Sequence, residues 1–407
     1  MKLPPRPHPL SRSPLVERAC GWLESAWTKG LTARPTLDPD ALFAKAAKDA
    51  PARGEHGPRS AEDVDDFRLR LYTLCEALQE QAKLNALGLT IAHGQIARVI
   101  RQRLELGAFW LEQPETLAAE LAPPIIVVGQ MRSGTTRIHR LLAADPAIAA
   151  TRFCDSWHPV PRKPDTRPAW SMLSLLFARK LDPWLDSIHP FGVTRPDEEL
   201  GWLACALDHC AYEAQWRIPA FSAFSEARDP APVYREFARI LRTDAQFHGN
   251  ANIPRVLKVP QFAEDLSALL SQFPDARVIR THRDGEDMAA SAASLVANQM
   301  TIQSDDVEMD WIESEMARKI ALRELRMNAA LEEFDGPSST VSFEDLNDDW
   351  EAEMQRAYSE LGLELRHEAL SAMRTEQDNA QSSPHHNHAA QQAKFSENSE
   401  EIAAARP

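Results

Sequence analysis

The chain is 407 residues long, and its 60 acidic and 45 basic side chains give a formal net charge of −15. At this length we expect a substantial core and one α/β domain with a helical annex, rather than two equal domains. The negative charge would repel nucleic acid, which excludes nucleic-acid binding as the expected function. No apolar run approaches the roughly 20 residues of a membrane span. The start of the chain lacks the apolar segment of a secretory signal, so we expect a cytoplasmic protein.

The part of the chain before residue 123 is predicted to be helical. Apolar residues recur at helical spacing within 67–78 and again within 91–100. The charged stretch 46–61, which precedes these two segments, contains Gly and Pro and is typical of a linker. We therefore expect residues 1–122 to form a helical extension with flexible segments. The cysteines are odd in number and widely spaced, which favours reduced thiols over a disulfide framework; they are Cys20, Cys75, Cys154, Cys205 and Cys210.

Residues 125–136 are the most informative segment, and they read Ile-Ile-Val-Val-Gly-Gln-Met-Arg-Ser-Gly-Thr-Thr. The four β-branched residues predict a strand buried on both faces, and the apolar spacing after the loop predicts a helix. A strand, tight loop and helix present backbone N–H groups and a helix N-terminus to a phosphate. The glycine spacing is that of a P-loop, but Thr135 stands where ATP-binding loops carry Lys. A cation, Arg132, lies inside the loop instead.

Two further segments predict strands that end in polar residues. Residues 255–260 end at a proline, and residues 277–284 lead into a loop in which Asp284 can cap the next helix. Arg283 at this strand end and Ser291 on that helix are separated by about two helical turns, so both can donate to one phosphate. A last strand is predicted over 339–346, followed by an amphipathic helix that ends near Gly362.

Together these segments resemble the PAPS-dependent sulfotransferases, whose bacterial members often carry Arg-Ser-Gly-Thr-Thr in this loop. The resemblance covers roughly residues 123–365. It implies an α/β fold, P-loop-like and three-layered, with a central, mainly parallel sheet, here preceded by the helical extension. It also implies 3′-phosphoadenosine 5′-phosphosulfate (PAPS) as sulfuryl donor, with no metal required. The family holds the 5′-phosphosulfate by the loop and the 3′-phosphate by an Arg and a Ser; the matching residues are Arg132, Ser133, Gly134, Thr135, Thr136, Arg283 and Ser291.

The resemblance suggests candidates for catalysis as well. Lys258 occupies the place of a family lysine that approaches the transferring group. Relatives carry a histidine base close after this lysine, but here Pro260 and then Gln and Phe follow, so a carboxylate is the natural substitute. Asp155, which aligns with a Glu of bacterial relatives, is the first candidate. Glu198 and Glu199 are the next candidates for the base, because relatives often carry an acidic pair here. His158 and His209 also remain possible bases.

An insertion over residues 152–230 is implied to shape the acceptor pocket of a domain that spans 123–375, with a polar tail over 376–407. The aromatic residues of the insertion suit an apolar or sugar acceptor, and they suit core packing equally well. The expected partner is a small-molecule, lipid or carbohydrate acceptor with a hydroxyl or amine. Two alternatives stay open: a non-catalytic member that binds nucleotide, and a P-loop phosphotransferase that would use ATP and Mg²⁺. The sequence does not indicate an oligomeric state.

Overall fold

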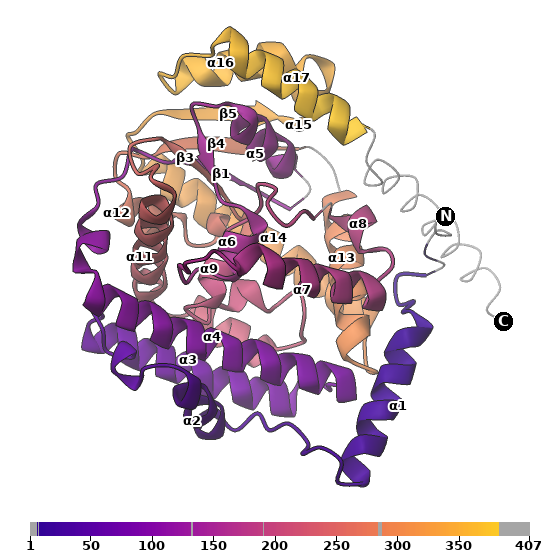
Figure 1. Cartoon of the computed structure of the whole chain (residues 1–407). Coiled ribbons are helices and arrows are strands. Elements are labelled where there is room, and N and C mark those ends of the chain that lie inside the picture. The colour runs from indigo at the N-terminus through magenta and orange to yellow at the C-terminus, as the bar shows by residue number, and fades with distance from the viewer. Residues whose placement is uncertain (1–5, 7, 132, 190, 284–286, 382–407) are drawn as a thin grey trace, which may run out of the picture.

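A parallel β-sheet forms the centre of the molecule. The structure is a computed structural model and describes residues 6, 8–131, 133–189, 191–283 and 287–381. The strands lie in the order β2-β3-β1-β4-β5, and every neighbouring pair is parallel. The sheet confirms the predicted α/β class (Figure 1). Its strands are β1 (Ile125–Gly129), β2 (Ala149–Ala150), β3 (Arg255–Lys258), β4 (Arg277–His282) and β5 (Ser338–Ser342).

Helices cover both faces of this sheet, because successive residues of β1 point to opposite sides. Ile125 and Val127 pack on one side, and Ile126 and Val128 on the other. The first side is covered by α5 (Thr135–Ala144), α16 (Trp350–Glu360) and α17 (His367–Gln381). The second side is covered by α11 (Ala231–His248), α12 (Leu266–Gln272) and α14 (Met309–Glu332). The result is the expected three-layer arrangement (Figure 1).

The N-terminal helices share a core with the insertion. Tyr212, Trp216 and Phe221 of the insertion pack in one cluster with apolar residues of the N-terminal helices. The stretch 46–61, predicted to be a linker, is instead held in place, because the buried guanidinium of Arg59 pairs with a buried glutamate of α11. These helices are α1 (Pro14–Thr28), α2 (Pro39–Asp49), η1 (Ala52–Gly54), α3 (Ala61–Glu80), α4 (Ala86–Glu112) and η2 (Pro114–Ala118).

The remaining elements connect the strands. Between β2 and α11 the insertion contains α6 (Phe153–Trp157), α7 (Arg167–Leu181), α8 (Leu185–Ile188), α9 (Leu200–Ala204), η3 (His209–Ala211) and α10 (Pro219–Glu226). Later connections contain η4 (Pro260–Ala263), α13 (Asp287–Gln303) and α15 (Phe343–Asp348). None of the described helices has the length and apolarity of a membrane span. All five cysteines are buried free thiols, as expected.

One strand prediction was too long. Residues 343–346, expected to complete the last strand, begin α15 instead. The hydroxyl of Ser342 accepts hydrogen bonds from the backbone N–H groups of Glu344 and Asp345, which is the geometry of a helix N-cap. The cap turns the chain out of the sheet directly after β5, and it brings the ring of Phe343 to the loop that follows β1.

Candidate functional site

The loop after β1 is fastened to the neighbouring strand β4. Gly129 pairs in register with Thr281, and a Cβ on Gly129 would lie 2.0 Å from the Thr281 hydroxyl, so only glycine fits. The Ser133 hydroxyl lies 2.6 Å from the Thr281 hydroxyl and donates to the Gln130 carbonyl at 2.7 Å. The hydroxyl of the predicted loop residue Ser133 therefore forms hydrogen bonds within the protein, and these hydrogen bonds stabilise the conformation of the loop.

The end of this loop opens into the first turn of α5. Gly134 has φ +93°, a left-handed conformation that favours glycine, and a Cβ there would lie 3.1 Å from the ring of Phe343. Helical geometry leaves the N–H groups of Thr135 and Thr136 without partners inside the helix. They stand at the positive end of the helix dipole, which suits an anion. Arg132, the predicted cation of this loop, lies outside the described residues.

Lys258 joins the end of β3 to this loop. Its side chain is only 1% exposed, and its ammonium group donates to the Thr136 hydroxyl at 3.0 Å. The same ammonium group forms an ion pair with Glu198, whose side chain is 20% exposed. Three of the predicted residues, Thr136, Lys258 and Glu198, therefore meet at one point although they come from three separate segments. This point lies at the carboxyl ends of β1 and β3, where ligands bind in open α/β sheets.

Glu199 is a buried residue that forms a hydrogen bond with the backbone of Lys258. One of its carboxyl oxygens accepts the backbone N–H of Lys258 at 2.9 Å, and the residue is completely buried. Burial raises the pKa of Glu199 to about 8, so the carboxyl group is largely protonated at neutral pH. Its other oxygen has no hydrogen-bond partner within the described chain. A buried, protonated carboxyl group cannot serve as the base, but it can hold the end of β3 in position.

Asp155, the first sequence-based candidate for the base, is engaged in ion pairs. Its carboxylate is 1% exposed and pairs with Arg152 at 2.6 Å, Arg167 at 3.0 Å and His248 at 3.1 Å. Burial by itself would raise the pKa of Asp155, but the hydrogen bond from His248 and the two guanidinium groups hold it well below its usual range. Such a carboxylate has little affinity for a proton, which argues against Asp155 as the base.

The second strand end carries Arg283. It follows β4, directly beside β1, and its guanidinium group lies 4.4 Å from the centre of the Phe343 ring. Ser291 lies on α13 and is buried. Asp284, which the sequence suggests as the cap of this helix, lies outside the described residues. Phe343 thus lies near both the start of α5, where its ring is beside Gly134, and the end of β4, where its ring is beside Arg283.

Comparison with known proteins assigns this arrangement to a family. Residues 123–367 match the model of the sulfotransferase family. The chain belongs to the sulfotransferase family. Among solved structures, the sulfotransferase STF1 of Mycobacterium tuberculosis is 26% identical, with a TM-score of 0.71, over 88% of this chain and 97% of that one. The sulfotransferase STF9 of Mycobacterium avium is 20% identical, with a TM-score of 0.73, over 84% and 87% of the two chains. A comparison with curated proteins found no match.

The two histidines that the sequence left open are both unsuitable as the base of this sulfotransferase. His158 is largely buried, and burial together with the nearby Arg98 lowers its pKa to about 4. His209 lies in a buried ion network. Burial would lower its pKa, but the Glu264 carboxylate, 2.9 Å away, outweighs this effect and raises it. Both ring nitrogens of His209 are engaged inside this network, one by Glu264 and the other by the Ser225 hydroxyl at 2.9 Å.

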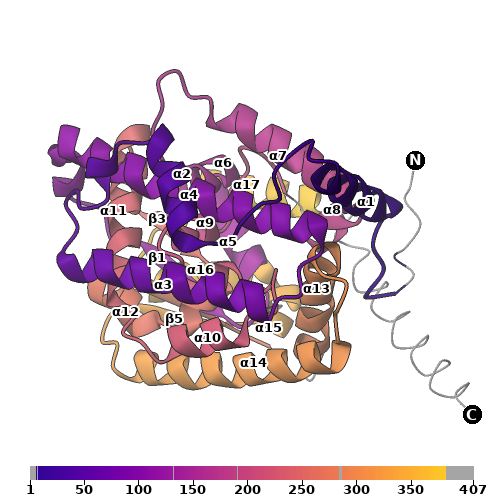
Figure 2. The ribbon, with the colours of Figure 1, turned by 90° about the horizontal axis from the view of Figure 1, so that it is seen from below.

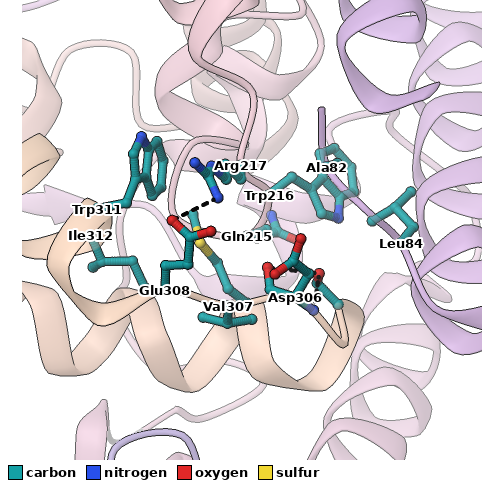
Figure 3. A pocket seen from close by; sticks show the side chains of 12 residues that line it. Ala82, Leu84, Gln215, Trp216, Arg217, Asp306, Val307, Glu308, Trp311 and Ile312 are labelled. Carbon is teal, nitrogen blue, oxygen red and sulfur yellow. Dashed lines mark hydrogen bonds and ion pairs between the residues drawn. The ribbon is translucent and has the colours of Figure 1, made fainter. Parts of the chain in front are cut away.

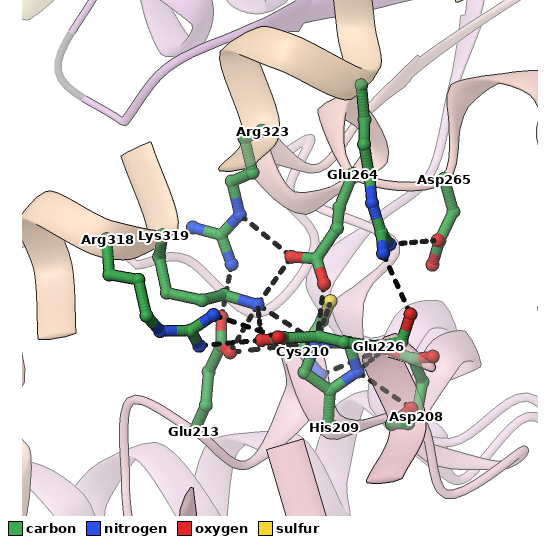
Figure 4. A network of polar contacts seen from close by, with 12 residues as sticks. Asp208, His209, Cys210, Glu213, Glu226, Glu264, Asp265, Arg318, Lys319 and Arg323 are labelled. Atoms are coloured by element: carbon green, nitrogen blue, oxygen red, sulfur yellow. Dashed lines mark hydrogen bonds and ion pairs between the residues drawn. The ribbon is translucent and has the colours of Figure 1, made fainter. Parts of the chain in front are cut away.

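Sequence reasoning missed this buried network, which underlies the sulfotransferase site (Figure 4). Lys319 of α14 lies at its centre, 2.5 Å from Glu264 and 3.1 Å from Glu213. Arg323, one turn further along α14, also pairs with both glutamates and contacts the sulfur of Met131 at 4.0 Å. The network therefore connects α14 to the segment after β3 and to the phosphate loop. No local sequence signal reveals it, because its charges come from distant segments.

Two hollows of the described structure are lined by residues other than Lys258. One is a small space of about 10 Å³ beside Trp216 and Trp311, where Arg217 and Glu308 form an ion pair of 3.3 Å (Figure 3). It has room for about one water molecule and not for an acceptor. The other is an open depression of about 470 Å³ that is lined by Pro124 and its neighbours. It lies at the amino ends of β1 and β4, opposite the candidate site.

Proposed function

We propose that this protein transfers a sulfuryl group from PAPS to a hydroxyl or amine of an acceptor molecule. The observation that carries the proposal is the meeting of Lys258, Thr136 and Glu198 at the strand ends beside the phosphate loop. PAPS, when bound, supplies the sulfuryl group and a nucleotide leaving group with charges at both ends. The residues at the two adjacent strand ends match these charges.

The donor set fits such a doubly charged nucleotide. A buried ammonium group, the Thr136 hydroxyl and the first N–H groups of α5 form a cradle for anionic oxygens at the end of β1. Arg132 would add a bidentate donor to this cradle. Arg283, at the end of β4, would hold the 3′-phosphate together with Ser291. The absence of a lysine at position 135 weighs against a P-loop phosphotransferase.

Within this arrangement Lys258 stabilises negative charge. Its ammonium group is nearly excluded from water, and electrostatic interactions are stronger in such surroundings. Positive charge that is already in place stabilises the charge that develops during transfer without reorganising. Glu199 contributes by holding the backbone of Lys258, and the ion pair with Glu198 keeps the ammonium group at the Thr136 hydroxyl.

Glu198 is the proposed general base. Of the three carboxylates suggested by the sequence, it is the one that reaches Lys258 and is also partly exposed, so an acceptor can approach it. Glu199 is buried and largely protonated, and Asp155 is neutralised by its ion pairs. A carboxylate beside the bound sulfuryl group can take the proton of the acceptor hydroxyl or amine as the new bond forms.

Two measurements test the proposed function. Calorimetry compares the affinity for 3′,5′-adenosine bisphosphate with that for ATP and Mg²⁺, in the wild type and in Arg132→Ala. We expect the bisphosphate to bind more tightly and the substitution to abolish its binding. Release of the bisphosphate from PAPS in the presence of phenols, sterols, sugars and lipids then tests transfer. Tighter binding of ATP would favour a phosphotransferase, and binding without transfer to any acceptor would favour a non-catalytic member.

A further inference from the structure

Helix α7 presents its apolar side to the solvent. Its buried face contains an arginine, a serine and two leucines: Arg167, Ser171, Leu175 and Leu181. Its exposed side chains include five large apolar ones, each between 50% and 59% exposed; these are Trp170, Met172, Leu173, Leu176 and Phe177. At about 100° per residue they cover an arc of about 160° of the helix. A contiguous apolar surface of this kind marks an interaction site.

The orientation of α7 is fixed by its buried face. Arg167 pairs with Asp155 at 3.0 Å and with Asp165 at 2.8 Å. At the other end, the backbone carbonyl of Leu181 accepts a hydrogen bond from the Ser13 hydroxyl at 2.7 Å. Turning the apolar face inward would break the ion pairs of a buried guanidinium group, which is strongly unfavourable. The ion pairs of Arg167 therefore keep the apolar face of α7 directed outward.

The position of α7 leaves this face accessible. Figure 2 shows the helix at the outer edge of the molecule, beside α8 and α1. The five apolar side chains all belong to this one helix, so they form a ridge along it. A partner must therefore adapt to an isolated, protruding apolar ridge, and the surface of a lipid layer does so because its chains and headgroups rearrange around an inserted side chain.

The charge around α7 differs from that of the whole protein. The chain carries a net charge of −15, yet α7 contains no acidic residue. Lys180 at its end and Lys163 shortly before its start are both exposed, and neither forms an ion pair with any described residue. A helix with an aromatic and aliphatic face and lysines at its ends has the composition of helices that lie in a membrane interface.

We propose that the apolar face of α7 docks on a lipid surface, with Trp170, Leu173 and Phe177 inserted among the acyl chains and the flanking lysines at the headgroups. A second copy of this chain suits the face less well. Two α7 helices paired face to face would bring their flanking lysines together without acidic residues on either helix. Docking on lipid goes beyond sulfuryl transfer and can be measured without it.

Flotation of the full chain with vesicles tests this docking. We expect the wild type to float with phosphatidylcholine vesicles, and more strongly with vesicles that also contain phosphatidylglycerol. The double substitution L173S/F177S should weaken this binding at least about tenfold. The matched control L111S/L325S changes two leucines that are 48% and 70% exposed elsewhere, and should bind like the wild type. Lys180→Glu should remove only the preference for anionic lipid.

Each alternative outcome is decisive. If the wild type does not float, or if L173S/F177S floats equally well, the proposal is overturned. If the wild type elutes as a dimer in size-exclusion chromatography and L173S/F177S as a monomer, with no flotation, a second copy covers α7 and the proposal is overturned as well. Unchanged circular dichroism and thermal midpoint show that the variants fold. Trp170→Ser, measured by the same flotation, gives an independent test should the double variant unfold.

Discussion

The ammonium group of Lys258 lies 3.0 Å from the hydroxyl of Thr136, although 122 positions separate these residues in the chain. Both residues stand at the carboxyl ends of neighbouring parallel strands, because β3 pairs directly with β1. This contact joins the phosphate loop, the end of β3 and, through the ion pair, Glu198 in one site. Four expectations follow from the arrangement of this site and its surroundings.

Replacing the Lys258 ammonium group should remove catalysis more than binding. In Lys258→Met, the stem of the side chain is kept but the charge beside the phosphate loop is lost. We expect turnover with PAPS to fall about 10²–10³-fold. Affinity for 3′,5′-adenosine bisphosphate should change less than about tenfold, because the other donors remain. Initial rates and calorimetry on the same preparation separate the two effects, and an equal loss of both would refute the assignment.

The two adjacent glutamates should behave differently. Glu198→Gln removes the proposed base and should lower turnover about 10²–10⁴-fold. Glu199→Gln keeps an oxygen that can accept the Lys258 N–H, so most of the turnover should remain. The measurement is turnover against pH with one acceptor for both variants. If Glu199→Gln is the more damaging of the two, the role of base does not belong to Glu198.

Arg283 should discriminate nucleotides by their 3′-phosphate. Arg283→Ala removes a charge-assisted contact and should weaken 3′,5′-adenosine bisphosphate about 10–100-fold, with little effect on AMP. Phe343→Leu keeps an apolar side chain but removes the ring beside the guanidinium group, so a loss of only about 2–5-fold is expected. Calorimetric titration of both nucleotides measures these ratios. Equal losses for AMP and the bisphosphate in Arg283→Ala would place the 3′-phosphate elsewhere.

Stability should decrease as the solution becomes alkaline. The hydrogen bond to Asp155 raises the pKa of His248 from its model-compound value of 6.5 to about 9. A raised pKa means that the folded state holds the proton more tightly than the unfolded chain. The resulting stabilisation is complete below about pH 6.5 and is lost as the pH rises through about 9.

Urea unfolding at several pH values measures this loss. The free energy of unfolding of the wild type should fall across this interval, and His248→Gln should show a smaller slope. His56, which is exposed, provides the matched control, and His56→Gln should keep the slope of the wild type. A slope in His248→Gln equal to that of the wild type would show that another group is responsible.

Local patterns were sufficient to predict much of the sulfotransferase fold. The β-branched run before Gly129 predicted β1, and the apolar spacing after the loop predicted α5. Pro260 predicted where β3 ends, and the polar residues that follow β4 predicted where that strand ends. These predictions succeed because strand and helix periods, glycines and prolines act within a few residues. The end of β5 was misplaced, because a serine cap there competes with continuation of the strand.

The choice among carboxylates could not be made from the sequence. Asp155 aligns well with a family glutamate, but its partner His248 is 93 positions away and reaches it only through folding. Glu198 and Glu199 are neighbours in the chain, yet the partly exposed Glu198 pairs with the Lys258 ammonium group and the buried Glu199 accepts its backbone N–H. Burial and ion pairing decide protonation, and both are properties of packing between distant segments.

The sequence by itself indicated the loop after β1, the ends of β3 and β4 and the class of the fold, because these depend on short-range conformational preference and on apolar periodicity. Only the tertiary structure decided which acid faces Lys258, that Phe343 lies beside Arg283 and which side of α7 is exposed. In α7 the periodicity alone would have turned the apolar side inward. The ion pairs of Arg167 turn it outward, because a buried charge must keep its partners.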